Sequence, residues 1–402
     1  MKIGLLTYHA VFNFGANLQV HSTYQYLKNA KHDPVVINYI PEDLEAGYKR
    51  GHPAEQIGLH EQFLKGNMVI SEKCRNSEDV ARIIKKEGIE TVIIGSDAVL
   101  QHKGLWSRMY LTRKGLKFRP RRSNLVFPNP YWGCFIPYLH KKIPVSVLSA
   151  SSQNTNYRII PPVKKRAMRR ALERFQWITV RDQWTRRMVS HLTSGKRVPE
   201  VTPDPVFAYN QNITYQPGEQ ETKKKFDLPE KYVLFSFKHG DKVDYNWLDK
   251  CKVILMNKGF VPICLTMPWG IPFREVPFRV IETPLDPIDW YALIRYSSGY
   301  IGENMHPIII CLHNVVPFFA FDSYGIIRLK YFLNEESSKT YHILNEAGFK
   351  ENRISISARS YRIPAPENVL NHIFSFDKEK CKRFSDRQLS TYNEMMQKIL
   401  QF

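Results

Sequence analysis

Short apolar runs alternate with amphipathic helical patterns along this chain, and they do so in two successive series. In the first series, the strand-like runs lie at residues 3–7, 35–39, 91–94, 144–150 and 177–180. The helical patterns between them lie at residues 18–29, 77–86 and 161–174. Strands that alternate with helices indicate a parallel sheet with helices on its faces. The first half of the chain is therefore expected to form an α/β domain.

The same alternation starts again in the second half. Strand-like runs lie at residues 232–237, 261–266, 300–301 and 316–321. Helical patterns lie at residues 245–258, 286–296 and 307–312. A final helical pattern at residues 377–401 is long enough to cross back onto the first domain. The expected fold class is α/β, with two doubly wound Rossmann-like domains that face each other across a cleft.

The length of 402 residues supports this division, because one hydrophobic core rarely serves so long a chain. We predict an N-terminal Rossmann-like domain at residues 1–213 and a C-terminal one at 230–376, with the C-terminal helix at 377–402. Residues 214–229 are rich in Gln, Glu, Lys and Pro and lack apolar periodicity, which is typical of a linker.

The composition limits the partners. A formal charge of +20 favours nucleic acid, anionic lipid or a phosphorylated substrate, without distinguishing among them. The six cysteines show no C-x-x-C pair or metal-like spacing, so we expect free thiols in a reducing cytosol. No apolar run approaches 18–20 residues and no secretory signal opens the chain, so neither a membrane span nor export is expected.

Residues 103–142 fit neither series and form an insertion in the first domain. A basic part ends at Arg122, and an aromatic run follows at residues 127–138. The basic residues are Arg113, Lys114, Lys117, Arg119, Arg121 and Arg122. Cations beside exposed aromatic rings suit an anionic membrane surface. The alternative is a protruding loop packed on its own domain or on a second subunit.

Polar residues collect where the predicted strands end. They are His9, Asn13, Gly15, Asp97, Ser151, Arg181, Lys238, His239, Glu303, Asn304 and His306. The carboxyl ends of parallel strands meet at one edge, where helix N-termini favour an anion, so these residues are candidates for one binding site. The alternative is that they cap helices, and for His306 that it is a satisfied histidine at a helix start.

The familiar phosphate-binding and catalytic signatures are missing. The chain has no G-x-x-x-x-G-K-[S/T], G-x-G-x-x-G, H-E-x-x-H or G-x-S-x-G sequence. Side-chain cations or helix ends must then hold a phosphate. Arg181 is the best candidate, because a guanidinium binds carboxylate or phosphate with two parallel hydrogen bonds. The alternative for Arg181 is an ion pair with Asp182 or with a carboxylate of the second domain.

Seven segments in order along the chain, taken together, resemble the polysaccharide pyruvyl transferase family. They lie at residues 2–8, 13–19, 93–97, 149–151, 179–182, 204–207 and 304–306. The resemblance implies a GT-B-like fold with the acceptor on the N-terminal domain and the donor on the C-terminal domain. It also implies transfer of a pyruvyl group from phosphoenolpyruvate, as co-substrate and without a cofactor, to a sugar as a ketal.

The family pattern often has Arg-x-His where this chain has Asn304, Met305 and His306. Another cation must then bind the donor together with Arg181, and the candidates are Lys238, Arg295 and Arg328. We expect His306 to transfer the proton, since an imidazole exchanges protons at neutral pH. Asp97 is the expected base toward the acceptor hydroxyl, and Glu303 is a further proton-transfer candidate. No metal ligand set is found, so a metal-independent reaction is expected.

Charge and insertion together suggest an acceptor sugar on a lipid pyrophosphate, which would place the enzyme peripherally on the cytoplasmic face of the membrane. The alternative enzyme class is a GT-B glycosyltransferase that uses a nucleotide sugar. Nucleic-acid binding is not expected, because the basic residues are spread along the chain without a recognition motif.

Overall fold

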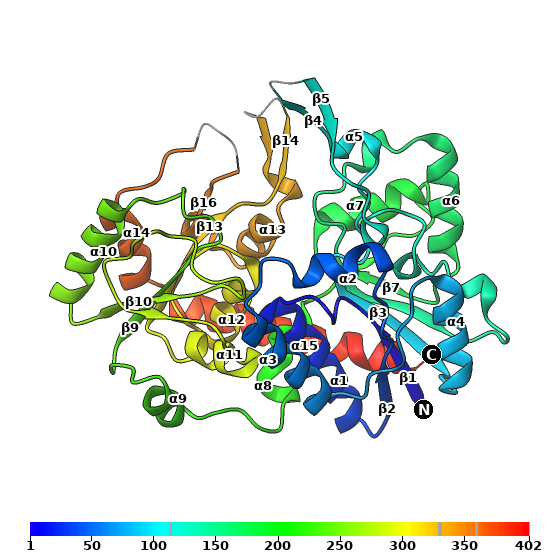
Figure 1. The fold of residues 1–402 in the computed structure, drawn as a ribbon, viewed down its shortest axis with the longest axis horizontal. Coiled ribbons are helices and arrows are strands. Elements are labelled where there is room, and N and C mark those ends of the chain that lie inside the picture. The colour runs from blue at the N-terminus through cyan, green and yellow to red at the C-terminus, as the bar shows by residue number, and fades with distance from the viewer. Residues whose placement is uncertain (113–114, 329–331, 358–360, 402) are drawn as a thin grey trace.

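The computed structural model describes residues 1–402 except 113–114, 329–331, 358–360 and 402. The chain forms two six-stranded sheets, each with helices packed on both faces (Figure 1). A separate hydrophobic cluster lies on each face of each sheet. The predicted fold class is therefore confirmed.

The first sheet is parallel, with the strand order β2-β1-β3-β6-β7-β8. Its strands are β1 (Lys2–Leu6), β2 (Asp33–Val36), β3 (Thr91–Asp97), β6 (Val145–Ala150), β7 (Ile178–Val180) and β8 (Glu200–Val201). The chain goes from β1 to β2 on one side and continues from β3 on the other. The order thus reverses between β1 and β3, and such a reversal is where open α/β sheets bind ligands.

The second sheet repeats this plan, with the order β11-β10-β9-β12-β13-β16 and parallel pairing throughout. Its strands are β9 (Tyr232–Ser236), β10 (Val261–Leu265), β11 (Val280–Ile281), β12 (Gly299–Gly302), β13 (Phe318–Asp322) and β16 (Arg353–Ser355). Its reversal lies between β9 and β12. The described residues also form two antiparallel hairpins: β4 (Met109–Thr112) with β5 (Gly115–Phe118), and β14 (Ile326–Arg328) with β15 (Phe332–Asn334).

Helices connect the strands. Those of the first domain are α1 (Phe14–Asn29), α2 (Glu42–Lys49), α3 (Ala54–Asn67), α4 (Ser77–Lys86), α5 (Leu105–Arg108), α6 (Pro162–Glu173), α7 (Gln183–Leu192) and α8 (Tyr209–Asn212). The others are α9 (Glu219–Lys225), α10 (Tyr245–Asn257), α11 (Pro287–Arg295), α12 (Met305–Asn314), α13 (Lys339–Glu346), α14 (Pro366–Phe374) and α15 (Lys378–Leu400). Among the described residues, no helix is long and apolar enough to cross a bilayer.

The long helix α15 joins the two domains, as expected for the C-terminal segment. Its first half places Cys381 and Phe384 in a core cluster of the second domain. Its second half places Tyr392 and Met396 in the cluster that contains β1 of the first domain. One helix therefore contributes to the cores of both domains.

Helix α1 begins at Phe14, four residues before the expected start at residue 18. The side chain of Asn13 accepts a hydrogen bond from the Ala16 N–H at 3.2 Å and so caps the helix. Polar residues such as Asn17 and Gln19 are buried on α1. Because the first turns are buried all round, no amphipathic pattern marks their start.

The expected linker at residues 214–229 contains a helix, α9. Lys223 Nζ lies 2.8 Å from Glu219 Oε1 and 2.8 Å from Glu230 Oε2. Phe226 and Leu228 pack against a core cluster of the second domain. This segment is thus part of the second domain's structure, and the domain boundaries stay a prediction.

The aromatic part of the insertion is buried, which corrects the expectation of exposed rings. Tyr131, Trp132 and Phe135 are at most 1% exposed and belong to a core cluster of the first domain, because short 3-10 turns direct them inward. Tyr138 is 55% exposed. The alternative of packing on its own domain holds for this part. The basic part begins in the β4–β5 hairpin, which projects from the body (Figure 1), and its arginines from Arg119 on follow β5. Arg113 and Lys114 lie outside the described residues.

The two domains also contact each other directly. The Phe14 ring of α1 stacks on Trp290 of α11, with ring centroids 5.1 Å apart. The Gln56 side chain of α3 donates to the Leu285 carbonyl and accepts from its N–H, both at 2.7 Å. Packing and hydrogen bonds therefore hold the two sheet reversals opposite one another.

Candidate active site

A cleft of about 350 Å³ lies between the two domains at the sheet reversals. The first domain lines it with residues that follow β1 and β3, and the second with residues that follow β9 and β12. The polar lining residues at these strand ends are Asn13, Asp97, Gln101, Lys238, Asn304 and His306. The structure thus brings together strand ends that are far apart in the sequence.

His306 is the second residue of α12 and is 8% exposed. Its Nε2 lies 3.7 Å from Asp204 Oδ2 and has no hydrogen-bond partner among the described residues. Burial lowers the pKa of His306 to about 4, although Asp204 acts to raise it. The imidazole is therefore neutral at pH 7, and the alternative of a satisfied structural histidine does not apply.

The His306 ring packs directly on the backbone of Gly15 in α1. An ideal Cβ on Gly15 would lie 2.6 Å from the Cβ of His306 and would overlap the ring atoms Nδ1 and Cγ. Only glycine leaves room for the ring at this position. Gly15, which was predicted as a binding residue, thus sets the position of the imidazole.

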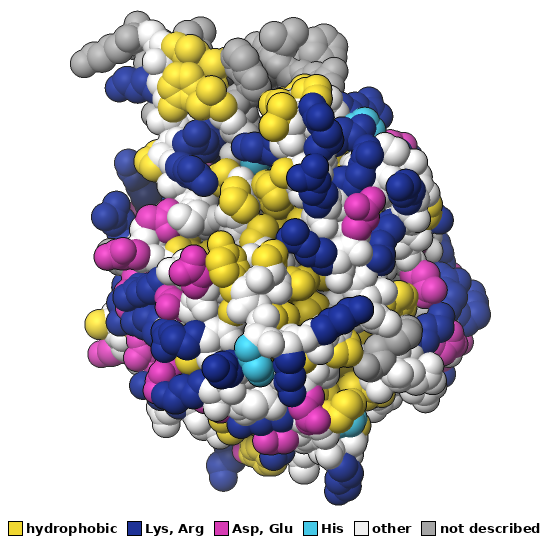
Figure 2. Space-filling model, turned by 90° about the vertical axis from the view of Figure 1, so that its right-hand side faces the viewer, with side chains coloured by type: hydrophobic (Ala, Val, Ile, Leu, Met, Phe, Trp, Pro, Cys, Tyr) yellow, Lys and Arg dark blue, Asp and Glu magenta, His cyan; other side chains and the backbone are white. Residues whose placement is uncertain are grey.

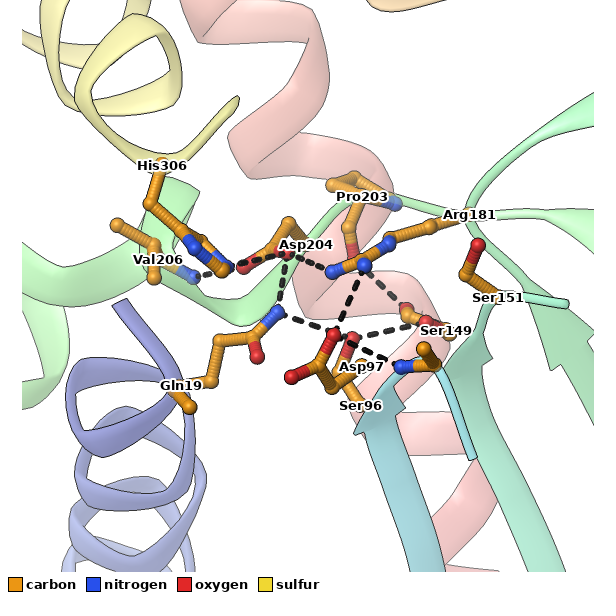
Figure 3. A network of polar contacts seen from close by, with 12 residues as sticks. Gln19, Ser96, Asp97, Ser149, Ser151, Arg181, Pro203, Asp204, Val206 and His306 are labelled. Atoms are coloured by element: carbon orange, nitrogen blue, oxygen red, sulfur yellow. Dashed lines mark hydrogen bonds and ion pairs between the residues drawn. The ribbon is translucent and has the colours of Figure 1, made fainter. Parts of the chain in front are cut away.

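Arg181, at the end of β7, holds two carboxylates of its own domain (Figure 3). Its Nη1 lies 2.8 Å from Asp204 Oδ2 and its Nη2 lies 3.1 Å from Asp97 Oδ1. The side chain is 3% exposed and does not line the cleft. Of the two interpretations of Arg181, the structure shows the ion pair, but with partners other than Asp182 or a second-domain residue.

Asp204 connects this network to α1. Its carboxylate accepts hydrogen bonds from the side chain of Gln19 and, at 3.1 Å, from the Val206 N–H. Gln19 also donates to Ser96 Oγ at 3.3 Å. Figure 3 shows these contacts converging on Asp204 beside the His306 ring. The network therefore fixes the carboxylate that faces the imidazole.

Asp97 ends β3 with a φ of 83°, which turns its side chain toward the cleft. Burial acts to raise its pKa, but Arg181, Lys339 and His306 outweigh that effect and lower it. Oδ1 accepts from Arg181 and, at 2.7 Å, from the Ala98 N–H. Within the described residues, no donor reaches Oδ2, which leaves an ionised oxygen for a ligand.

Lys339, the first residue of α13, is a site residue that sequence reasoning missed. It lines the cleft and is 9% exposed, and its Nζ lies 4.5 Å from the centre of the Tyr324 ring. Burial, followed by Arg181, lowers its pKa to about 8, so it is charged at pH 7. A lysine at a helix N-terminus opposes the helix dipole, and that unfavourable placement is the signal that could have identified it.

Glu303 is fully buried and supports the loop after β9. Its Oε1 accepts from the N–H groups of Lys238 at 3.2 Å and His239 at 3.0 Å, and its Oε2 lies 2.8 Å from His239 Nδ1. Neither Glu303 nor His239 lines the cleft. This geometry favours positioning of Lys238 over the proton transfer that was predicted for Glu303.

The other predicted residues fall into two groups. Asn13 and Asn304 line the cleft, and Asn304 accepts a hydrogen bond from the Tyr324 hydroxyl at 3.3 Å. His9 lines a separate cavity of about 560 Å³ and contacts Asn38 Oδ1 at 3.0 Å.

Ser151 donates to Asp182 Oδ2 at 2.7 Å and is fully buried. Arg295 donates to the side chains of Asn210 and Gln216 and does not line the cleft. The side chain of Arg328 lies outside the described part of the structure. Of the cations expected in place of the family arginine, Lys238 lines the cleft, and the unforeseen Lys339 lines it as well.

Comparison with known proteins supports a shared family and fold. A model of the polysaccharide pyruvyl transferase family matches residues 13–324, more than three quarters of the chain. No curated protein sequence matches the chain.

Solved structures with a similar fold include UDP-N-acetylglucosamine 2-epimerase from Rickettsia bellii, at 11% identity and a TM-score of 0.56, covering 100% of this chain and 96% of the epimerase. The corresponding epimerase from Neisseria meningitidis, solved with UDP-GlcNAc bound, has 10% identity and a TM-score of 0.55, with 100% and 99% coverage. At these identities the likeness shows the two-domain GT-B fold alone.

Proposed function

Because the chain belongs to the polysaccharide pyruvyl transferase family, we propose that it transfers the pyruvyl group of phosphoenolpyruvate to a hexose and forms a pyruvate ketal. One observation carries the proposal. A neutral buried imidazole (His306), a buried ammonium group (Lys339) and a carboxylate oxygen that no donor of the described residues reaches (Asp97) face the same cleft.

The donor requires cations, since phosphoenolpyruvate carries both a carboxylate and a phosphate. Lys339 and Lys238 line the cleft, and the N-terminus of α12 adds backbone N–H groups and a favourable dipole. In this proposal Lys339 takes the place of the family arginine. Arg181 does not contact the donor in this proposal; its ion pairs hold Asp97 and Asp204 in place.

His306 supplies the proton for the vinyl carbon. The imidazole is neutral in the empty cleft, but a doubly anionic donor beside it raises its pKa, as Asp204 already does. The ring therefore takes up a proton as the donor binds. It then passes this proton to C3 of the donor, which leaves an oxocarbenium-like centre at C2.

The acceptor sugar supplies two hydroxyls. The first bonds to C2 and gives its proton to Asp97 Oδ2, and the second bonds to C2, displaces phosphate and closes the ketal ring. One hydroxyl proton thus replaces the proton that went to the new methyl group, and the other leaves with the phosphate. The rings of Trp269 and Tyr324 in the cleft wall offer apolar faces for the sugar.

We further propose that the hexose is carried on a lipid pyrophosphate and that the enzyme works peripherally on the cytoplasmic face of the membrane. The support is the net charge of +20 and the exposed cations of the insertion. No metal or cofactor takes part in the proposed reaction.

The test is incubation with phosphoenolpyruvate and a panel of galactose, glucose and mannose acceptors. Inorganic phosphate and a new ketal methyl signal are expected, and neither should form with the His306→Gln variant. Thermal stabilisation by a nucleoside diphosphate, without stabilisation by phosphoenolpyruvate, would instead favour the nucleotide-sugar glycosyltransferase.

A further inference from the structure

The β4–β5 hairpin exposes an apolar face that nothing in the described chain covers. In its register Met109 lies opposite Phe118, and Leu116 is two residues before Phe118. Successive side chains of a strand point to opposite faces, so these three share one face. They are 36% (Met109), 48% (Phe118) and 54% (Leu116) exposed. Leu105 of α5, just before the hairpin, is also 54% exposed.

Exposed cations lie next to this apolar face in the chain. Lys117 points to the opposite side of β5, and Arg119, Arg121 and Arg122 follow directly after the strand, all of them exposed. Figure 2 shows hydrophobic side chains at the top of one face of the molecule with Lys and Arg side chains beneath them. Apolar groups that can insert, beside cations that can reach phosphates, match the charge and layering of an anionic bilayer surface.

A second hairpin, β14–β15, rises from the other domain at the same edge (Figure 1). Ile327 is 39% exposed there and lies opposite Leu333. The base of this hairpin touches the first domain, since Asn154 donates to the Gly325 carbonyl at 3.3 Å. Both domains thus present an apolar hairpin on one side of the molecule.

Both hairpins start at the wall of the cleft. Leu125, shortly after β5, and Tyr324, just before β14, both line it. Lys103 comes two residues after Gln101 of the cleft wall. Burial, followed by the charges of Arg122, Arg119 and Lys238, lowers the pKa of Lys103, so these cations lie near it. The cationic surface is therefore continuous with the cleft.

We infer that the β4–β5 hairpin, together with the β14–β15 hairpin, is a docking surface for an anionic lipid bilayer. This inference rests on the proposed function, because a membrane-bound enzyme needs a surface that binds the membrane. Docking through these hairpins turns the mouth of the cleft toward the lipid headgroups. A substrate anchored in the membrane then reaches Asp97 and His306 without leaving the bilayer.

The test is flotation of the full chain with vesicles of phosphatidylcholine alone or with 30% phosphatidylglycerol, without substrates. Binding to the anionic vesicles is expected, and binding to the neutral ones is not. The variant Lys117→Gln/Arg121→Gln/Arg122→Gln should lose about 100-fold in partitioning, since each cation near the surface contributes about fivefold. Leu116→Ser/Phe118→Ser should lose at least tenfold.

The matched control is Arg166→Gln/Arg170→Gln/Arg174→Gln, which removes the same charge from the exposed side of α6 and the turn after it. It should change partitioning less than threefold. An equal loss in this control, or failure of the wild type to float, overturns the inference. So does conversion of a dimer to a monomer by Leu116→Ser/Phe118→Ser in sedimentation, which would make a second copy the occupant.

The two proposals fail separately. Flotation needs no turnover, and turnover of a soluble hexose needs no vesicles. Phosphate release without flotation removes the docking surface only, and flotation without phosphate release removes the transferase reaction only. Circular dichroism of each variant verifies that the fold is intact.

Discussion

Replacement of Gly15 by alanine tests whether the imidazole of His306 is held where the chemistry needs it. The two residues meet where α1 of the first domain packs against α12 of the second. The change adds one methyl group and removes no polar contact. Its effect must therefore act through the position of the ring.

The structure gives the size of this effect. The new Cβ would lie 2.6 Å from the Cβ of His306 and would overlap two ring atoms. Carbon atoms pack at about 3.5–4.0 Å, so the ring must move by roughly 1 Å. A misplacement of about 1 Å in a catalytic site can cost on the order of 100-fold in rate. Overpacking costs about 1–3 kcal/mol of stability, and the better helix propensity of alanine offsets up to about 1 kcal/mol of that.

We therefore expect Gly15→Ala to lower phosphoenolpyruvate-dependent phosphate release about 100-fold while the free energy of unfolding falls by about 0–3 kcal/mol. Denaturant titration and a phosphate assay measure the two quantities. Gly58→Ala in α3 is the control, because its new Cβ meets nothing within 4 Å and should leave the rate unchanged. Full activity and full stability in Gly15→Ala would refute the steric reasoning.

Three further changes test the rest of the site. Lys339→Met should raise the KM for phosphoenolpyruvate at least tenfold. In the wild type this KM should rise as the pH passes about 8, the pKa of Lys339, because the ammonium group then loses its charge. A KM that stays constant from pH 6.5 to 9.5 would argue against a role of Lys339 in donor binding. The same change should raise the free energy of unfolding by on the order of 3 kcal/mol at pH 7, because burial of the charge costs stability in full below pH 8. Since the unfolded state binds more protons between pH 8 and about 10.5, that gain should disappear over this window in denaturant titrations. Proton uptake on binding of phosphoenolpyruvate, measured calorimetrically in buffers of different ionisation enthalpy, should be present in the wild type and absent in His306→Gln; equal uptake in both would remove the imidazole from the proton path. Arg181→Met should destabilise the protein by about 3–5 kcal/mol, because Asp204 is left buried without its cation, and a loss below about 1 kcal/mol in chemical denaturation would contradict the network.

Sequence reasoning identified most of the strands and about half of the polar residues that line the cleft. The helical pattern at residues 77–86 coincides with α4, and the apolar run at residues 91–94 forms the first four residues of β3. Asp97, Asn304 and His306 follow such runs, so strand ends alone were enough to bring them to one edge. Glu303 and Ser151 follow strands too, but their side chains turn inward and support neighbouring loops.

Two features could not be read from the chain. Lys339 follows no predicted strand and reaches the cleft because η6 (Glu335–Ser337) and α13 lead it there. From the sequence, both the basic run and the aromatic run of the insertion were expected to be exposed. In the structure, Trp132 of the aromatic run is buried, whereas Phe118 beside the basic residues is exposed. Burial of one and not the other depends on contacts with distant parts of the first domain, which local composition does not encode.

The alternation of apolar runs and helices by itself determined two doubly wound sheets, because strand and helix periodicities are local and parallel pairing follows from their order. Only the tertiary structure decided which side chains carry charge in the cleft. Packing of α1 against α12 buries His306 and keeps it neutral, and α13 brings Lys339 beside two carboxylates that Arg181 already holds. Desolvation and Coulomb interactions depend on distances between residues that are remote in sequence, so the protonation states of the site exist only in the folded chain.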